Sequence, residues 1–423
     1  MCLEDSAQIY RRRQSTKFFM SNAQTNSPMN TGDNRLPQFD GVRKIALITG
    51  IAGLVISIPA LIMNPEQFHR SYLLAYMCCL AIPLGCMGLV MMHHLTGGGW
   101  GFIIRRILEA GTRTLWLMAI LYVPMLVGLS RIYGWARADA VSIPVYQQKH
   151  FYLNVPFFVV RSVIYFAIWM GLAWFLNKWS AQQDEPGNPS AEKKLEGISG
   201  PGLVLWGTAV TFSAVDLVMS LEPTWFSSIY GMMIMVVYAL SAMAFVIFIA
   251  RKLTDREPLV QIATAQRFND LGNFLLTFVM LWAYLSFSQF LIIWSGNMPE
   301  EISWYMARAH GSWGALALLL IIFHFAIPFV LLLSRDIKRG PRALSGVAGA
   351  LVLLTLVDIF WLIVPAFEPN GLRLHWSNFS LLAGFGGLWL WAFFVQLEKR
   401  PLLPAYDSRL AEVLEDHEHV HQI

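Results

Sequence analysis

Long apolar stretches alternate with short polar ones along most of the chain, between about residue 45 and residue 397. Each apolar stretch has the length of an α-helix that crosses a hydrocarbon core about 30 Å thick, which needs about 20 residues. Because lipid cannot satisfy open backbone donors and acceptors, each stretch predicts a continuous transmembrane helix. None shows the period-2 alternation of a barrel strand. The ten predicted helices are Ile45–Met63, Ser71–Met92, Thr114–Ser130, Val155–Asn177, Gly202–Met219, Ile229–Ala250, Leu271–Trp294, Gly311–Leu333, Ala343–Pro365 and Phe379–Leu397.

The pattern therefore predicts an all-α polytopic membrane protein in three parts. A polar segment over residues 1–44 precedes a ten-helix domain over residues 45–397, and a tail follows over residues 398–423. Composition agrees, because only 14% of the residues are charged, against about 25% in soluble domains. The loops are short, so we expect no large soluble domain that holds an active site.

Lysine and arginine residues set the expected orientation. If the amino terminus lies in the cytoplasm, 24 of the 31 lysines and arginines fall on the cytoplasmic side and six on the other, and Arg161 lies inside the fourth helix. This bias follows the positive-inside rule and places both termini in the cytoplasm. The first 44 residues have no apolar core, so we expect no cleavable signal peptide.

Two helices carry a similar short motif. Residues 213–217 read Ser-Ala-Val-Asp-Leu and residues 355–359 read Thr-Leu-Val-Asp-Ile, and a Glu-Pro pair follows each of them. The fifth and ninth helices, which carry these motifs, run in the same direction across the membrane. The repeat predicts a parallel duplication, with two four-helix bundles (helices 2–5 and 6–9) flanked by helices 1 and 10.

The two motifs place a carboxyl group inside the membrane, where a charge is costly and marks a functional candidate. Asp216 has Ser213 on the same helix face, and Asp358 has Thr355. A carboxyl group beside hydroxyl groups suits a proton relay, but Arg161 lies at the depth of Asp216 and also suits a structural ion pair. Both interpretations of Asp216 stay open. Asp358 has no basic residue at its depth, which favours a relay.

His324 lies near the middle of the eighth helix and is a further candidate for the proton path, although a lone membrane histidine is often a packing residue. Thr277, Tyr284 and Ser288 share one face of the seventh helix and would extend the path as a water wire, or serve as ordinary contacts between helices. No second histidine lies at the depth of His324, as a bis-histidine haem requires. The sequence predicts no catalytic residue, no metal site and no covalently bound cofactor.

The second connection differs from the other loops. It contains three glycines at residues 97–99 and then the basic and apolar run Phe102–Leu108. Without a following Gly-Lys-Ser or Gly-Lys-Thr, the glycines form no phosphate-binding loop. The run predicts a short helix that lies on the membrane surface.

Three segments carry a resemblance to a known family: residues 285–294 (LSFSQFLIIW), residues 296–301 (GNMPEE) with Trp304 and Tyr305, and residues 93–101 (HHLTGGGWG). The chain resembles the F subunit of bacterial alternative complex III, a quinol:cytochrome c oxidoreductase. That subunit is related to the NrfD-like, polysulfide-reductase-type membrane proteins. The similarity extends from about Ile45 to Arg400.

The resemblance implies a subunit of a respiratory quinol oxidoreductase in the bacterial inner membrane, with a role in proton conduction, in assembly or in binding quinone (menaquinone or ubiquinone). It also implies several partners: a homologous NrfD-like membrane subunit, haem c subunits, a periplasmic iron–sulfur subunit and a terminal oxidase. Haem c and the iron–sulfur clusters are expected in those partners and not in this chain. The alternatives are a secondary transporter and a purely structural membrane subunit.

Overall fold

The computed structural model describes residues 37–184, 190–256, 259–404, 407 and 409. Within these residues all regular structure is helical, and no strand is present. The predictions for residues 1–36, including the absence of a signal peptide, and those for the end of the tail fall outside the described residues.

Ten helical segments of the described chain are long and apolar enough to cross a membrane. This confirms the predicted fold class, and the chain is an integral multi-pass membrane protein. Several helices begin or end one to two turns beyond the predicted ranges. The segments are α2 (Pro37–Met63), α3 (Pro65–Thr96), α4 with α5 (Gly99–Thr112 and Leu115–Val127), α8 (Val155–Gln182), α9 (Ser190–Leu217), α10 (Tyr230–Leu253), α11 (Ala265–Gly296), α13 with η5 and α14 (Gly311–Leu319, Leu320–Ala326 and Ile327–Leu333), α16 (Pro341–Ile363) and α17 (Trp376–Leu397).

Short helices complete the connections. They are α6 (Leu129–Ile132), η1 (Gly134–Ala136), η2 (Ala140–Ser142), α7 (Pro144–Lys149), η3 (Met219–Leu221), η4 (Leu259–Gln261), α12 (Pro299–Ala309), α15 (Arg335–Arg339) and η6 (Val364–Ala366).

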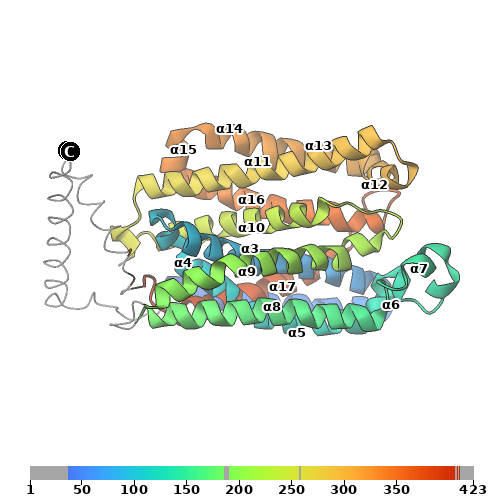
Figure 1. Cartoon of the computed structure of the whole chain (residues 1–423), viewed down its shortest axis with the longest axis horizontal. Coiled ribbons are helices and arrows are strands. Elements are labelled where there is room, and N and C mark those ends of the chain that lie inside the picture. Colours follow the sequence, from blue (N-terminus) through green and yellow to red (C-terminus); the bar gives the residue numbers. More distant parts are fainter. Residues whose placement is uncertain (1–36, 185–189, 257–258, 405–406, 408, 410–423) are drawn as a thin grey trace, which may run out of the picture. The chain divides into compact units, whose positions relative to one another are not determined.

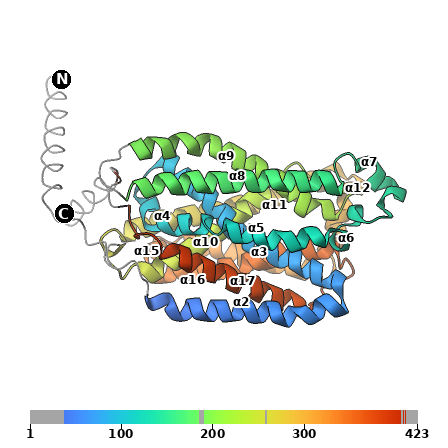
Figure 2. The same cartoon turned by 90° about the horizontal axis from the view of Figure 1, so that it is seen from below.

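The spanning segments form two groups of four. In the first, α3 packs on α4, α5 and α9, and α8 closes the ring by packing on α5 and α9. In the second, α10 packs on α11 and α16, and the segment α13–α14 closes the ring between them. The pairing of α3 with α10 joins the groups, and Figures 1 and 2 show these two helices in the interior.

The first and last spanning helices lie together instead of on separate sides of the bundles. α2 and α17 pack along each other, and α17 also packs on α3 (Figure 2). Their contact is close because glycines face backbone: a Cβ at Gly387 would lie 2.5 Å from the carbonyl oxygen of Ala46, and one at Gly53 would lie 2.5 Å from the amide of Gly384. Small residues of this kind let membrane helices approach and gain dispersion contacts.

The two ends of the helical domain differ in charge. We call the end that carries α4 and α15, on the left of Figure 1, the basic end. Arg105 lies in α4 and Lys338 in α15, while Lys178 lies near the end of α8 and Arg400 follows the end of α17. The opposite end carries α6, α7 and α12. The distribution of lysine and arginine predicts that the basic end faces the cytoplasm.

α4 differs from its prediction. It is not a helix on the membrane surface, because every residue from Trp100 to Thr112 is buried. It packs on α3, α10, α11 and α17 and continues into α5 after a break at Arg113 and Thr114. Its basic residues indicated a surface position, but the fold supplies partners that neutralise them inside the protein.

The α2–α17 contact generates a prediction for stability. In Gly387→Ala the new methyl group meets backbone that cannot yield easily, so we expect the free energy of unfolding to fall by about 1–3 kcal/mol. Gly386→Ala is the matched control, because a Cβ there has no atom within 4 Å. Thermal unfolding of both variants in detergent measures the difference. Equal melting temperatures for the two variants would refute the close contact.

Candidate functional site

The two membrane aspartates occupy corresponding places in the two bundles. Asp216 lies near the end of α9 and Asp358 near the end of α16, and the side chains are only 1% and 2% exposed. Each accepts a hydrogen bond from an aromatic side chain on another helix of its bundle. The donor is Tyr165 Oη for Asp216, at 2.7 Å, and Trp282 Nε1 for Asp358, at 3.0 Å. The acid is thus repeated on corresponding helices, whereas its aromatic donors come from helices that do not correspond, α8 and α11.

Asp216 forms the ion pair with Arg161 that its depth suggested. Arg161 Nε donates to Oδ2 at 2.8 Å and Nη2 donates to Oδ1 at 2.9 Å, which is a bidentate arrangement. The remaining group, Nη1, donates to the carbonyl of Tyr152 at 2.9 Å, and the guanidinium lies 3.8 Å from the centre of the Tyr152 ring. Because the charges cancel and every donor group has a partner, this pair serves as a structural link between α8 and α9.

Asp358 has different surroundings. In the described part of the chain it forms no ion pair, and Trp282 Nε1 is its one recorded side-chain donor. The carboxyl group is therefore buried without a countercharge. Loss or gain of its proton leaves no fixed cation unpaired, in contrast to Asp216.

His324 contacts the same indole ring that donates to Asp358. Its ring meets the Trp282 ring edge-on, with 4.5 Å between centroids, and its Nε2 lies 3.5 Å from Thr355 Oγ1. The side chain is fully buried, and Nδ1 has no hydrogen-bond partner among the described residues. Trp282 thus contacts both His324 and Asp358, and we call Trp282, His324, Thr355 and Asp358 the Asp358 group.

An irregular helix presents His324 to this group. Residues Leu320–Ala326 form a π-helix between α13 and α14. Pro328 follows and has no backbone N–H to donate to the carbonyl of His324, which weakens the regular α-helical pattern at this point. π-Helical segments within α-helices are frequent at functional sites.

The predicted water wire on the seventh helix does not line the Asp358 group. Tyr284 is 65% exposed on the outer face of α11, and Thr277 is exposed as well. The inward face carries Trp282 and Gln289 instead. The prediction chose the face by its hydroxyl groups, but the large indole ring of Trp282 fills the interior.

The other hydroxyl candidates have local roles. Ser213 is buried and donates to the carbonyl of Val210 at 2.9 Å, one turn away from Asp216. Thr355 donates to the carbonyl of Leu351 at 2.8 Å and lies in contact distance of His324. Ser288 is half-buried on α11 and is not in the Asp358 group.

The glutamine of the segment 285–294 ties the second bundle to neighbouring connections. Gln289 is buried; its Oε1 accepts from Ser227 Oγ at 3.0 Å and its Nε2 donates to Tyr305 Oη at 3.4 Å. Nearby, Arg308 Nη2 donates to Glu222 Oε1 at 2.7 Å and to the carbonyl of Leu362, one turn beyond Asp358, at 3.1 Å. These bonds tie α11, α12 and α16 to the connection between α9 and α10.

A second polar cluster lies at the basic end, and the sequence analysis missed it. Arg105 and Arg106 on α4 both bond Glu109 of the same helix, at 3.0 and 2.7 Å. Arg105 Nη1 also donates to Asp407 at 2.6 Å, and Ser180 Oγ donates to Glu109 at 2.6 Å. The i, i+3 and i, i+4 spacing of the three α4 residues was the available signal. Asp407 is more than 300 residues away in sequence and gave none.

Asp407 stays ionised in this cluster. Burial by itself raises the pKa of Asp407, but the guanidinium groups of Arg105 and Arg409 outweigh it and hold the pKa below its ordinary value. The start of the tail is therefore held against α4 by charge. We expect it to stay attached at neutral pH.

The glycine-rich segment 97–101 has a packing role. Gly97 and Gly98 take φ values of 65° and 88°, which a residue with a side chain rarely adopts, and turn the chain back from α3 into α4. Gly101 lies against the ring of His93 so closely that a Cβ would overlap it. Both ring nitrogens of His93 are buried without a partner among the described residues.

No group of three or more metal-ligating side chains occurs among the residues that the structure describes. Cys78, Cys79 and Cys86 are buried and free on α3, in apolar surroundings. The chain matches no family model and no curated protein. The resemblance to alternative complex III therefore stays a prediction.

The Arg161–Asp216 pair generates a prediction. In Arg161→Leu the Asp216 carboxylate is left buried without its cation, so we expect the free energy of unfolding to fall by about 3–5 kcal/mol. The double variant Arg161→Leu/Asp216→Leu removes both charges and should recover most of that loss. Thermal unfolding in detergent compares the two. A double variant no more stable than the single one would contradict a structural pair.

Proposed function

We propose that the chain is an integral membrane subunit of a respiratory quinol oxidoreductase and that the Asp358 group moves protons within it. The single observation that carries the proposal is the Asp358 carboxyl group, which is buried without a countercharge among the described residues. It accepts a hydrogen bond from Trp282, and the ring of Trp282 in turn contacts the ring of His324. Intramembrane acids of this kind are typical of proton relays. The resemblance of residues 93–101 and 285–305 supplies the class of complex.

In this proposal the first bundle has a structural role and the second bundle transfers protons. In the first bundle, protonation of Asp216 would leave Arg161 buried and unpaired, which is costly. In the second, gain or loss of a proton at Asp358 leaves no paired cation behind among the described residues, so this cost does not arise. His324 Nδ1 has no hydrogen-bond partner among the described residues, and Nε2 lies 3.5 Å from Thr355 Oγ1, so the ring has a nitrogen that can give or take a proton. Proton handling is accordingly assigned to the second bundle, and Asp216 to the structural pair.

Asp358 lies close to the end of α16 that is away from the basic end, so a path for protons from that end would be short. Arg308 is fully buried and bonds both the carbonyl of Leu362 and the carboxylate of Glu222. Glu222 is partly exposed, with 22% of its side chain accessible. Glu222 and Arg308 thus form a polar path toward Asp358 from the end that the positive-inside rule assigns to the periplasm.

Redox cofactors are assigned to partners. We expect haem c subunits, a periplasmic iron–sulfur subunit, a homologous NrfD-like membrane subunit and a terminal oxidase around this chain, with menaquinone or ubiquinone as the electron donor. The outward faces of α2, α8 and α11 are apolar and largely exposed, so they are available to lipid and to a membrane partner. A purely structural subunit would have no use for an unpaired acid such as Asp358.

Asp358→Asn tests the proton role. The amide oxygen can still accept from Trp282, so we expect the fold to persist, while the side chain can no longer bind and release a proton. Proton uptake coupled to quinol oxidation should fall by about a hundredfold, as on removal of a general acid or base. The assay uses proteoliposomes of the complex purified through the tagged chain, with a trapped pH indicator.

Two variants serve as controls for this assay. Asp358→Glu keeps a carboxyl group and should retain a measurable part of the rate. The double variant Arg161→Leu/Asp216→Leu removes the matching acid of the first bundle and should leave proton uptake near the wild-type rate. Wild-type proton uptake in Asp358→Asn would overturn the proposal.

Isolation of the tagged chain tests the class of complex separately. In a mild detergent we expect it to co-purify with haem c proteins, which a reduced-minus-oxidised absorption spectrum detects. A secondary transporter would be isolated without cytochromes. If the isolated complex has the same size as in the detergent extract of the membrane but shows no cytochrome absorption, the respiratory assignment is excluded and only the membrane fold remains.

A further inference from the structure

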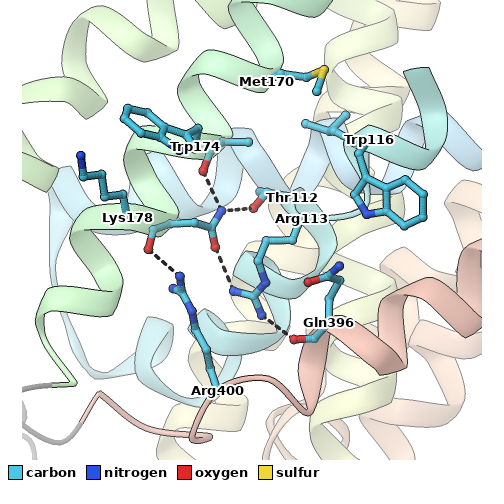
Figure 3. A pocket seen from close by; sticks show the side chains of 11 residues that line it. Thr112, Arg113, Trp116, Met170, Trp174, Lys178, Gln396 and Arg400 are labelled. Atoms are coloured by element: carbon cyan, nitrogen blue, oxygen red, sulfur yellow. Dashed lines mark hydrogen bonds between the residues drawn. The ribbon is translucent and has the colours of Figure 1, made fainter. Parts of the chain in front are cut away.

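A cavity of about 420 Å³ opens between α5, α8 and the end of α17, near the basic end. It is not part of the Asp358 group. Figure 3 shows its polar floor, formed by Arg113, Arg400 and Gln396, and its aromatic wall, formed by Trp116 and Trp174. The cavity therefore joins a cationic region to an apolar one.

The floor holds two guanidinium groups in fixed positions. Arg113 donates to Asn177 Oδ1 at 2.9 Å and to the carbonyl of Gln396 at 2.7 Å, and Arg400 donates to the carbonyl of Asn177 at 2.7 Å. Asn177 is itself held by Thr112, to which it donates at 2.9 Å. Because the three oxygens that accept from these arginines are neutral backbone or amide oxygens, the bonds orient the guanidinium groups and do not cancel their charge.

Donor capacity remains on both arginines. Arg113 Nε has no hydrogen-bond partner among the described residues, and neither has Arg400 Nη1. The acid nearest to Arg400 is Glu109, whose Oε2 lies 3.6 Å from Nη1 and already accepts from Arg106. Both unpaired nitrogens are themselves buried, and because Glu109 is shared with Arg105 and Arg106, the floor has a surplus of positive charge.

A third cation lies at the rim. Lys178 is exposed, and its ammonium group lies 4.5 Å from the centre of the Trp174 ring. Burial lowers the pKa of Arg400, with Glu109 opposing this shift, as expected for a cation that lacks a full countercharge. An anion in the cavity would supply that countercharge.

The wall matches hydrocarbon. Trp116, Met170 and Trp174 are 39%, 42% and 56% exposed on the outer surface of α5 and α8, where the spanning helices face lipid. A small free anion would contact the arginines and leave these apolar side chains without a partner. A ligand with a phosphate at one end and acyl chains at the other fits both parts of the cavity.

We infer that this cavity binds an anionic phospholipid, with its phosphate on Arg113 and Arg400, its headgroup beside Lys178 and its acyl chains along Trp116, Met170 and Trp174. Arginine suits the phosphate because its planar group offers parallel donors. Basic pockets between transmembrane helices bind anionic headgroups in this manner. The lipid would join α8 to α17 at the basic end.

Native mass spectrometry of the full chain tests the inference. The purified protein, stripped of lipid in detergent, is titrated with dioleoylphosphatidylglycerol, with dioleoylphosphatidylcholine, or with inorganic phosphate. We expect tighter binding of the glycerol lipid than of the choline lipid. Lys178→Gln should weaken binding of the glycerol lipid by about fivefold, the effect of one basic residue at an anionic surface. Lys178 is exposed, so this variant keeps the fold.

Matched variants separate the cavity from general surface charge. Lys194→Gln and Arg339→Gln each remove an exposed cation at the basic end, outside the cavity, and should leave lipid binding unchanged. Arg113→Gln should weaken it at least as much as Lys178→Gln. Equal binding of the two lipids, or equal losses in the cavity and control variants, would overturn the inference. Displacement of the lipid by inorganic phosphate would identify a free-anion site and overturn it as well.

Discussion

A charge inside the hydrocarbon region has to be neutralised, because transfer of an ion out of water costs far more than any single packing contact returns. Arg161 and Asp216 meet this constraint by bidentate pairing, and Arg105, Arg106 and Glu109 meet it through a network that includes Ser180. Much of the helix arrangement follows. α8 is fixed to α9, and α4 is fixed to α8 and to the start of the tail. Asp358 is the exception among these groups, since within the described part of the chain its side chain bonds a neutral indole and no cation.

The duplication explains why that exception stands out. Both bundles keep an aspartate near the end of the corresponding helix, and in each a different helix supplies an aromatic donor to it. The first bundle adds Arg161, which pairs with the acid through two hydrogen bonds. In the second bundle no arginine pairs with the acid in the described residues, and the third spanning segment contains the π-helix that carries His324. A repeated framework in which one copy is locked and the other is chemically free favours a division between support and proton handling, as proposed above.

The sequence was sufficient for the number and order of the spans, because hydrocarbon thickness sets the length of each apolar run. It also offered the Arg161–Asp216 pair as one of two interpretations, because depth along two adjacent helices can be counted. It was insufficient wherever a contact depended on distant segments. The indole of Trp282 reaches Asp358 across 76 positions, and Arg105 reaches Asp407 across 302. Neither is visible in local periodicity. Side-chain type also misled: hydroxyl groups selected the outer face of α11, and two arginines placed α4 on the membrane surface, although burial depends on partners and not on the residue alone.

The position of α4 bears on the expected orientation. The positive-inside rule concerns cations that face the cytoplasm, whereas Arg105 and Arg106 are buried and neutralised by Glu109. Setting these two aside still leaves most lysines and arginines at the basic end, including Lys178, which points outward at the rim of the lipid cavity. The exposed cations that remain are those that would meet anionic headgroups. The distribution of lysines and arginines in the sequence and the surplus positive charge of the cavity therefore both favour a cytoplasmic position for the basic end. The residues that give these two signals differ from those that hold α4 in place.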